Sequence, residues 1–342
     1  MRRFIVTGGA GFIGSNFVRL FLREHPDYVV TVLDKLTYAG NLANLADVDG
    51  DPRFTFVHGD ICDAAVVDEL AARHDCIINF AAETHVDKSL LEPGAFIQTD
   101  VFGTWTLLEA AKRHGHERFL HISTDEVYGH VPAGASREGD PLRPRSPYSA
   151  SKAGGEMQAW AYRDSFDMPI VITRGSNNYG PYQYPEKIIP LFITNAIDDL
   201  PLPLYGSGTA VRDYIHVEDH CRGIDTVLHR GEVGETYNLG GSNQTNGVEV
   251  ADAVLDALGK PASLKQFVAD RPGHDYRYSL DTTRARALGW APEHDFAGGI
   301  RATVQWYVDN EAWWRPLKSG EFWEYYKRNY RVAEGGAPLT PA

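Results

Sequence analysis

The chain contains very little cysteine. Only three cysteines occur in 342 residues, at Cys62, Cys76 and Cys221, and their spacing resembles neither zinc-ligand pairs nor a disulfide framework. The thirteen histidines do not suggest a metal either, because His114 and His116 lack the spacing of a His-Glu-x-x-His helix and no acidic cluster accompanies them. The sequence therefore predicts no metal, so any redox chemistry falls to a bound cofactor.

Net positive charge is also missing. The formal net charge of -13 excludes a general field that would attract nucleic acid or an anionic membrane. The apolar run behind Met1-Arg2-Arg3 is too short for a secretion signal, and no later run approaches the length of a membrane span. We therefore predict a cytoplasmic protein without nucleic-acid or membrane partners, in which an anionic substrate needs a local cluster of Arg and Lys.

Strand-like and helix-like segments alternate through the first half of the chain. With 43% hydrophobic residues, the composition is that of a globular enzyme with a large core. The alternation predicts an α/β fold with a Rossmann-type, doubly wound parallel sheet. The strand-like runs are residues 4–6, 29–33, 54–57, 76–80 and 119–122, and the helix-like segments are one that ends near residue 23 and those at residues 63–73, 95–113 and 148–166.

A glycine-rich turn follows the first strand-like run and precedes a helix-like segment. Gly8 can make the tight turn, Gly11 lets a pyrophosphate approach the backbone, and Gly14 allows close packing of helix on strand. Asp34 ends the second strand-like run, twenty positions after Gly14. Its carboxylate can accept hydrogen bonds from an adenosine ribose and would repel the extra phosphate of NADP, so NAD is the predicted cofactor.

Polar or small residues follow the strand-like runs, at Thr7, Asp34, Asp60-Ile61, residues 81–84 and residues 123–126. The carboxyl ends of parallel strands meet at one edge of a sheet, so one cleft can gather them. Turns rich in Pro and Gly increase after residue 175. We expect three regions: residues 1–175, mainly an NAD-binding Rossmann domain with the catalytic residues; residues 176–332, mainly a smaller, interleaved substrate-binding region with some return to the Rossmann core; and residues 333–342, a flexible tail.

Tyr148 and Lys152 are four residues apart at the start of a helix-like segment, so their side chains project from the same face. A cationic Lys152 favours the Tyr148 phenolate and lowers its pKa. Tyr148 could then remove a hydroxyl proton that Thr124 holds in place, while hydride leaves the same carbon for NAD. Alone, Tyr-x-x-x-Lys is also compatible with an ordinary amphipathic helix, and the upstream nucleotide motif favours oxidation.

Taken together, the motifs resemble the extended short-chain dehydrogenase/reductase family, and within it the nucleotide-sugar 4,6-dehydratases. The resemblance covers nearly the whole chain. It is carried by the glycine turn and by residues 34–41 (Asp-Lys-Leu-Thr-Tyr-Ala-Gly-Asn), 81–87 (Ala-Ala-Glu-Thr-His-Val-Asp), 124–126 (Thr-Asp-Glu), 148–152 (Tyr-Ser-Ala-Ser-Lys) and 176–181 (Ser-Asn-Asn-Tyr-Gly-Pro).

The resemblance implies a reaction in three stages, with dTDP-glucose as the expected substrate and NAD restored at the end. Tyr148, assisted by Lys152 and Thr124, would be the base for oxidation at sugar C4. Glu126 would then remove the C5 proton while protonated Asp125 donates to the departing C6 hydroxyl. Hydride returns to C6, which gives dTDP-4-keto-6-deoxyglucose and water. Without the resemblance, Asp125 and Glu126 would be read as a polar turn at a strand end.

The resemblance also implies which residues contact each ligand. Arg212 and Arg271 can make bidentate contacts to phosphate, which supplies local positive charge. The residues expected at NAD are Gly8, Gly11, Phe12, Ile13, Gly14, Asp34, Lys35, Thr37, Asp60, Ile61, Ala81, Ala82, Thr99, Tyr148, Lys152 and Asn178. Those expected at the nucleotide sugar are Thr84, His85, Ser89, Thr124, Asn177, Lys187, Arg212, Asn246, Arg271 and His274.

Two positions depart from the family pattern. Asp100 stands where relatives commonly have Asn, and Lys88 replaces a frequent Arg. Asp100 indicates either an altered proton path near the active-site helix or a tolerated neighbour.

Other functions are compatible with parts of the pattern. A 4-epimerase shares transient C4 oxidation but needs no Asp-Glu elimination pair, and a silent NAD-binding scaffold would not need Thr124, Tyr148 and Lys152. A homodimer is expected from the resemblance and from apolar side chains in the segments at residues 95–113 and 148–166.

Overall fold

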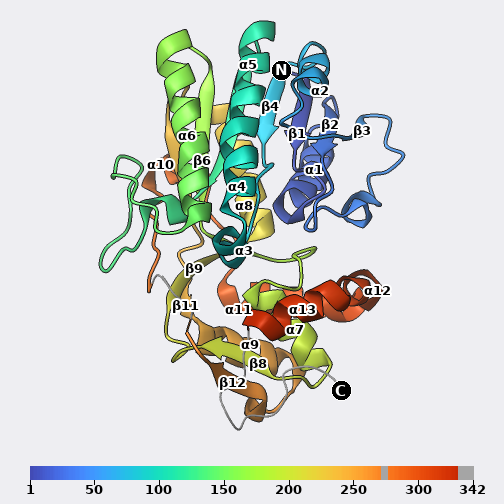
Figure 1. Ribbon diagram of the computed structural model, residues 1–342, viewed down its shortest axis with the longest axis vertical. Helices are drawn as coiled ribbons and strands as arrows, with labels where there is room; N and C mark the ends of the chain where they lie inside the picture. Colours follow the sequence, from blue (N-terminus) through green and yellow to red (C-terminus); the bar gives the residue numbers. More distant parts are fainter. Residues whose placement is uncertain (271–275, 330–342) are drawn as a thin grey trace.

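The computed structural model describes residues 1–270 and 276–329. Its larger part is built on a seven-stranded parallel sheet in the order β10-β6-β5-β4-β1-β2-β3 (Figure 1). The predicted Rossmann-type sheet is therefore confirmed. The strands are β1 (Arg3–Thr7), β2 (Val29–Asp34), β3 (Phe54–His58), β4 (Cys76–Asn79), β5 (Arg118–Thr124), β6 (Ile170–Gly175) and β10 (Thr236–Leu239).

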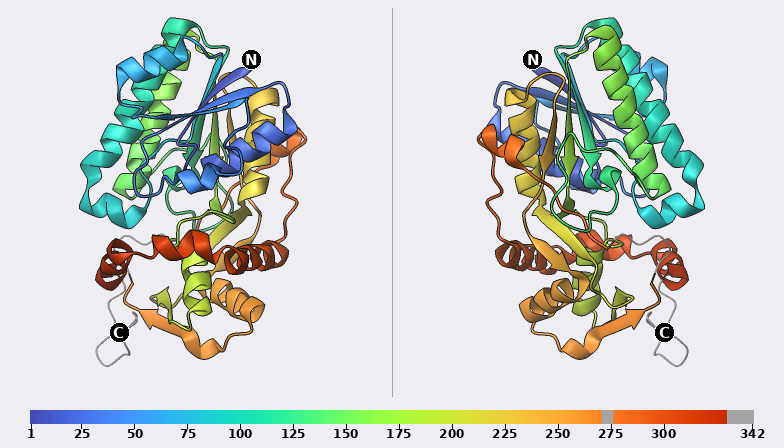
Figure 2. Two further views of the ribbon diagram at one scale, coloured as in Figure 1. Left: turned by 90° about the vertical axis from the view of Figure 1, so that its right-hand side faces the viewer. Right: turned by 90° about the vertical axis from the view of Figure 1, so that its left-hand side faces the viewer.

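Helices cover both faces of this sheet (Figure 2). In β1, Phe4 and Val6 pack on one side and Ile5 on the other, because successive side chains of a strand point to opposite faces. The first core contains α1 (Phe12–Glu24) and α8 (Val217–Arg230), and the second contains α2 (Ala64–Ala71), α5 (Thr104–His114) and α6 (Pro147–Phe166). Burial on both faces explains why these strands read as continuous apolar runs.

The helix predicted over residues 95–113 is divided in the structure. A short α4 (Pro93–Phe96) leads into a π-helical segment, η2 (Ile97–Gly103), before α5 begins. Here η2 lies so close to α6 that a side chain on Gly155 would meet the Asp100 carbonyl oxygen at 2.4 Å. The wider π turn brings Asp100 inward, and its side chain is buried.

The smaller part of the molecule has its own core and lies below the carboxyl ends of the large sheet (Figure 1). The chain enters it after β6 and returns to the large sheet through α8 and β10. Its strands form a three-stranded and a two-stranded sheet: β7 (Asn177–Tyr179), β9 (Val211–His216) and β11 (Gln244–Asn246), and β8 (Leu202–Tyr205) and β12 (Lys265–Val268). Its helices are α7 (Ile188–Ile197), α9 (Gly247–Leu258), α11 (Phe296–Asp309), α12 (Glu311–Trp314) and α13 (Gly320–Asn329).

Short helical turns complete the description. Two of them border the cavities described below, and the others lie in connections. They are η1 (Leu42–Leu45), α3 (Val86–Leu91), η3 (Asp125–Tyr128), η4 (Ala262–Leu264), α10 (Thr283–Ala287) and η5 (Arg315–Leu317).

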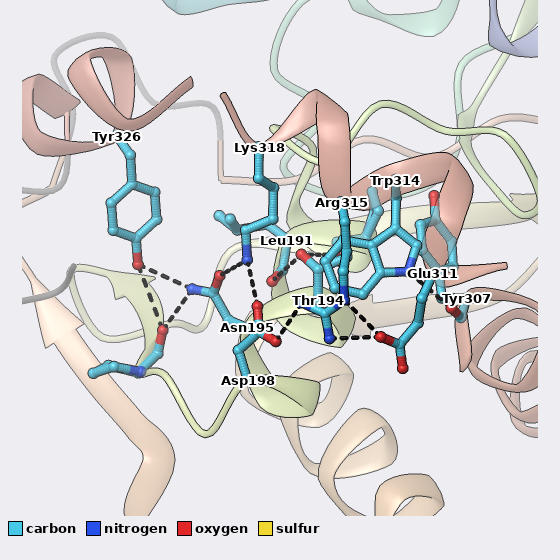
Figure 3. Close-up of polar contacts among 12 residues, drawn as sticks. Leu191, Thr194, Asn195, Asp198, Tyr307, Glu311, Trp314, Arg315, Lys318 and Tyr326 are labelled. Carbon is cyan, nitrogen blue, oxygen red and sulfur yellow. Dashed lines mark hydrogen bonds and ion pairs between the residues drawn. The ribbon is translucent and has the colours of Figure 1, made fainter. Parts of the chain in front are cut away.

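A buried lysine holds the C-terminal helices on α7 (Figure 3). Lys318 Nζ donates to Asn195 Oδ1 over 3.1 Å, and Asn195 Nδ2 donates to the Tyr326 hydroxyl over 3.0 Å. Only 4% of the Lys318 side chain is exposed, and burial lowers its pKa to about 8. The ring of Trp323 lies 5.1 Å from Nζ, so the amine is held between an amide and an aromatic face.

The C-terminal helices also reach the glycine turn. Trp313 Nε1 donates to Asn44 Oδ1 over 2.9 Å, and Asn44 Nδ2 donates to the Ala10 carbonyl over 2.9 Å. Two hydrogen bonds thus connect α12, near the end of the chain, with the turn that follows β1.

Within residues 1–270 and 276–329, no helix is both long and apolar enough to cross a bilayer. The predicted tail at residues 333–342 lies outside those ranges. The cytoplasmic location stays a prediction.

Candidate active site

The first cavity, of about 240 Å³, opens at the carboxyl ends of the strands and is bordered by the glycine turn. Gly8 has φ +66°, and a side chain there would meet the Ala81 backbone nitrogen at 2.7 Å. A side chain on Gly14 would lie 2.3 Å from the Gly8 carbonyl oxygen. Only glycine fits these two positions, so the first turn of α1 packs directly against β1 and faces the cavity.

Asp34 at the end of β2 shapes the same cavity. Its Oδ2 accepts the Ala10 backbone N–H over 2.9 Å and its Oδ1 accepts that of Leu36 over 2.8 Å. These bonds fix the carboxylate between the glycine turn and the following loop. A carboxylate offers about four acceptor positions, so Asp34 retains capacity for two hydroxyl groups of a ligand.

The residues expected at NAD come together in this cavity, with one exception. Asn178 does not line it, because its Nδ2 donates to the Ser176 carbonyl and its Oδ1 contacts His220 Nδ1. The expected residues that do line it are Gly8, Gly11, Phe12, Ile13, Gly14, Asp34, Lys35, Thr37, Asp60, Ile61, Ala81, Ala82, Thr99, Tyr148 and Lys152.

The start of α6 places Tyr148 and Lys152 against this cavity. Ser146 caps the helix through a reciprocal bond with Ser149, and Pro147 occupies the first turn, where its missing N–H costs nothing. One turn later, Lys152 Nζ donates to the Ile122 carbonyl over 2.8 Å. The cap and this buried bond fix the two side chains on the face of α6 that is turned toward β5.

The charges around Tyr148 differ from the sequence-based expectation. In the protein alone, burial raises the pKa of Tyr148 well above its usual value, and the charges of Glu126 and Asp100 act in the same direction. A hydrogen bond with Thr124 lowers it, but by less. Burial also lowers the pKa of Lys152. The expected lowering by Lys152 is therefore outweighed by desolvation and by neighbouring carboxyl groups.

Thr124, Asp125 and Glu126 occupy the turn from β5 into η3. The Thr124 hydroxyl accepts the Glu126 backbone N–H over 3.3 Å and donates to Asp125 Oδ1 over 3.2 Å. Asp125 is only 2% exposed, and its Oδ2 has no hydrogen-bond partner in the part of the chain that the structure describes. Burial, followed by the charges of Glu126 and Asp213, raises the pKa of Asp125 well above its usual range. Burial therefore favours the neutral form of Asp125, which can donate a proton.

A second cavity, of about 200 Å³, extends from Glu126 into the smaller part of the molecule. Of the residues expected at the nucleotide sugar, His85, Asn177, Lys187 and Arg212 line it. Thr84 lines the first cavity instead, where its hydroxyl accepts from Lys187 Nζ over 3.3 Å.

The remaining residues expected at the sugar lie elsewhere. Ser89 Oγ donates to the Val86 carbonyl, and Asn246 caps α9 by accepting the Glu249 N–H, so neither side chain lines a cavity. Thr124 lies between Ser123, which lines the first cavity, and Glu126, which lines the second. Arg271 and His274 are outside the described residues.

Sequence reasoning missed Glu186, which joins the two cavities, and Tyr38, which contacts it. Glu186 is buried and lines both, as does its neighbour Lys187. The Tyr38 hydroxyl donates to Glu186 Oε1 over 2.8 Å and lies 3.0 Å from the Thr84 carbonyl oxygen. Tyr38 follows Asp34 in the loop after β2, so this loop reaches the wall between the cavities. The sequence offered one signal for Glu186, its position next to the predicted Lys187. That position does not show that Glu186 lies in a wall shared by two cavities.

Comparison with known proteins agrees with this geometry. The model of the GDP-mannose 4,6 dehydratase family matches residues 5–303. The chain is 52% identical to a dTDP-glucose 4,6-dehydratase of Streptomyces niveus, over 93% of this chain and 96% of that enzyme. It is 45% identical to dTDP-glucose 4,6-dehydratase 1 of Escherichia coli, over 96% and 99%.

Solved structures give the same result. The crystal structure of a dTDP-glucose 4,6-dehydratase from Streptomyces venezuelae, with NAD bound, is 52% identical and superimposes with a TM-score of 0.90, over 92% of this chain and 100% of that one. A UDP-glucuronic acid 4-epimerase from Bacillus cereus shares the fold at 29% identity, with a TM-score of 0.85 over 90% and 99%. The chain therefore belongs to the family that the GDP-mannose 4,6 dehydratase model describes, and within it to the dTDP-glucose 4,6-dehydratases.

Proposed function

We propose that the protein is an NAD-dependent lyase that converts dTDP-glucose to dTDP-4-keto-6-deoxyglucose and water. The observation that carries the proposal is the buried Asp125 beside Glu126. Asp125 contacts the Thr124 hydroxyl, which also bonds Tyr148, and burial favours the neutral form of Asp125. Thr124 therefore contacts both Tyr148, which is suited to oxidation, and Asp125 of the Asp125–Glu126 pair, which is suited to elimination. A 4-epimerase would need only the first of them.

The first cavity fits NAD. The backbone at positions 8 and 14 has room only for glycine, and the first turn of α1 faces the cavity. Asp34 keeps acceptor positions for the hydroxyl groups of a ribose. When bound, NAD supplies reversible hydride transfer. Gly11 would face its pyrophosphate, and Lys35 and Asp60, which form an ion pair over 2.7 Å, would border it.

Oxidation at C4 requires that a proton leave the C4 hydroxyl. The Tyr148 oxygen takes that proton, and the Thr124 hydroxyl, which already contacts Tyr148, orients the sugar oxygen. Lys152, held by the Ile122 carbonyl, provides the positive charge that favours the phenolate once the site is closed to water.

Elimination requires an acid and a base on neighbouring carbons. The Glu126 carboxylate faces the second cavity and takes the C5 proton, which the C4 ketone has made acidic. Neutral Asp125 gives its proton to the C6 hydroxyl, which leaves as water. When C6 regains the hydride that left C4, Glu126 returns its proton to C5. Tyr148 now holds one proton too many and Asp125 lacks one, and the Thr124 hydroxyl between them can pass it across.

The proposal is tested with dTDP-glucose that carries deuterium at C4, without added reductant. Mass spectrometry should show the loss of one water with the label retained, and fragmentation should place the deuterium on C6. A product of unchanged mass would indicate a 4-epimerase, and no reaction with any nucleotide sugar while NAD is bound would favour a silent protein.

Two variants separate the stages. Tyr148→Phe should block formation of reduced nicotinamide, which is followed by absorbance. Glu126→Gln should still allow that reduction but slow product formation by about 100-fold or more, because general-base catalysis is lost. Equal loss of both stages in both variants would contradict the assigned roles.

A homodimer is proposed as the assembly. Large apolar side chains are exposed on η2, α5 and α6, at Ile97, Phe102, Trp105, Met157 and Phe166. The helices that carry them pack side by side (Figure 2), and exposed apolar side chains are typical of a contact surface. Sedimentation should give twice the chain mass at assay concentration, and a monomer mass would contradict the proposal.

A further inference from the structure

A buried carboxyl group that the proposed reaction does not use lies behind Tyr148 and Lys152. Asp100, in the π-helical segment η2, is 2% exposed. Its Oδ2 accepts the Ser151 hydroxyl over 2.6 Å and its Oδ1 accepts the Glu83 backbone N–H over 2.9 Å. The Ser151 hydroxyl also lies 2.8 Å from the Tyr148 carbonyl oxygen, so it can donate to the Asp100 carboxylate or accept from the neutral acid while donating to Tyr148.

The contacts of Asp100 connect two walls of the site. Ser151 immediately precedes Lys152 on α6, and Glu83 belongs to the loop after β4 that lines the first cavity. The charged groups that reach Asp100 are Lys152 from α6 and Glu83 from that loop, and Asp100 in turn acts on Tyr148. Asp100 therefore lies near one cation, Lys152, and near two groups whose negative forms repel its carboxylate, Glu83 and Tyr148.

The electrostatic effects around Asp100 have definite directions. Burial raises the pKa of Asp100 to about 6, although Lys152, Ser151 and Glu83 N–H all favour the carboxylate. The charge of Asp100 raises the pKa of Lys152 against the effect of burial, and it also raises the pKa of Tyr148. Asp100 therefore favours the charged form of Lys152 and at the same time makes ionisation of Tyr148 harder.

We propose that Asp100 is a positioning residue whose carboxylate is the counter-ion of Lys152 and sets the pH range in which Tyr148 works as a base. This inference rests on the proposed function, because it concerns the proton transfer assigned to Tyr148. Above the pKa of Asp100 the carboxylate holds Tyr148 protonated, and below it the neutral acid releases this effect. Protonation of Asp100 thus partly compensates for the loss of phenolate as pH falls.

Asparagine can replace Asp100 with little change in packing. Its Oδ1 can accept the Glu83 N–H, and its Nδ2 can donate to Ser151 Oγ. The Ser151 hydroxyl can then donate to the Tyr148 carbonyl, which already lies 2.8 Å away. Asp100→Asn therefore removes one negative charge and can keep the hydrogen bonds to Glu83 and Ser151.

The test compares kcat/KM for water loss against pH in the wild type and in Asp100→Asn. The acid limb of the variant should move to lower pH by about one unit or more, as expected when one nearby like charge is removed at an effective dielectric of about 20. It should also become steeper, because the compensating proton is gone. Asp225→Asn is the control, since it removes a partly buried carboxyl group from α8 on the opposite face of the sheet and should leave the limb in place.

A second readout does not depend on turnover. Because the pKa of Asp100 is raised in the folded protein, the folded state binds more protons than the unfolded chain between about pH 4 and pH 6. Wild-type stability should therefore fall relative to Asp100→Asn as pH rises through this window, which thermal unfolding of both proteins measures.

The outcomes separate this inference from the proposed function. An acid limb that stays in place in a folded Asp100→Asn protein would overturn the inference while water loss by the wild type still supports the function. Absence of water loss in the wild type would remove the function itself, and the stability comparison would then still decide whether Asp100 carries a charge.

Discussion

The two cavities are assembled from the chain in different ways. The first is lined mostly by residues at or directly after the carboxyl ends of parallel strands, from Gly8 after β1 to Ser123 near the end of β5. The second is lined by pieces that are spread from His85 to Gly247 and belong to both parts of the molecule. The site at the end of a regular sheet can therefore be predicted from local sequence, whereas the second site depends on how separate segments pack.

The largest effect is expected from a substitution that disrupts only the first cavity. In Gly14→Ala the added methyl group would lie 2.3 Å from the Gly8 carbonyl oxygen, so α1 must move away from β1. NAD binding should weaken by about 100-fold or more, because a small displacement of the anion-binding turn loses several hydrogen bonds. Calorimetric titration with NAD measures this. Gly139→Ala is the control, since a methyl group there meets nothing within 4 Å.

The next effect concerns the second cavity. Arg212 lines it and lies over the Tyr278 ring at 4.7 Å. Arg212→Met should raise KM for the nucleotide sugar by roughly 10–100-fold, the value of a charge-assisted hydrogen bond to phosphate, with NAD affinity unchanged. Steady-state kinetics measures KM, and Arg73→Met, an exposed arginine on the surface, should have no effect. A matching loss of NAD affinity would show that the two cavities are not separate.

A smaller effect is expected at the shared wall. Tyr38→Phe removes the hydroxyl that bonds Glu186 and approaches the Thr84 carbonyl. Both NAD and the nucleotide sugar should bind about tenfold more weakly, the cost of roughly 1.4 kcal/mol for a buried acceptor left without its donor. Tyr276→Phe provides an exposed control. Weakening of only one ligand would assign Tyr38 to that cavity alone.

The smallest effect on activity is expected at a residue that lies away from both cavities. Lys318 has its pKa lowered to about 8 in the folded protein, so the folded state binds fewer protons than the unfolded chain between about pH 8 and pH 10. Wild-type stability should rise relative to Lys318→Met over this window, by about 1–2 kcal/mol. Thermal unfolding measures the difference, and turnover at pH 7 should be unchanged. A parallel pH dependence in both proteins would contradict the lowered pKa.

Much of the fold and of the first cavity could be predicted because their signals are local. The glycine turn and Asp34 each combine residue type with a strand that the sequence itself displays. The capped start of α6 is likewise local, since Ser146 and Pro147 mark it.

Other features depended on contacts between distant segments. The π-helical turn at Asp100 depends on the close approach of Gly155, fifty-five positions later, and the raised pKa of Tyr148 depends on burial that no local motif encodes. Glu186 faces both cavities only because the loop with Tyr38 folds onto it. Asn246 was expected at the sugar, yet the same side chain is an efficient helix cap, and sequence alone does not distinguish the two uses.

The link from Trp313 through Asn44 to Ala10 has a consequence for synthesis of the chain. The nucleotide turn and its neighbouring loop leave the ribosome long before the indole that secures the loop, because Asn44 and Trp313 are 269 positions apart. A nascent chain that lacks α12 cannot complete this brace. Full retention of the dinucleotide should therefore be acquired only after α12 has been synthesised, and a product truncated before α12 should exchange its cofactor more readily.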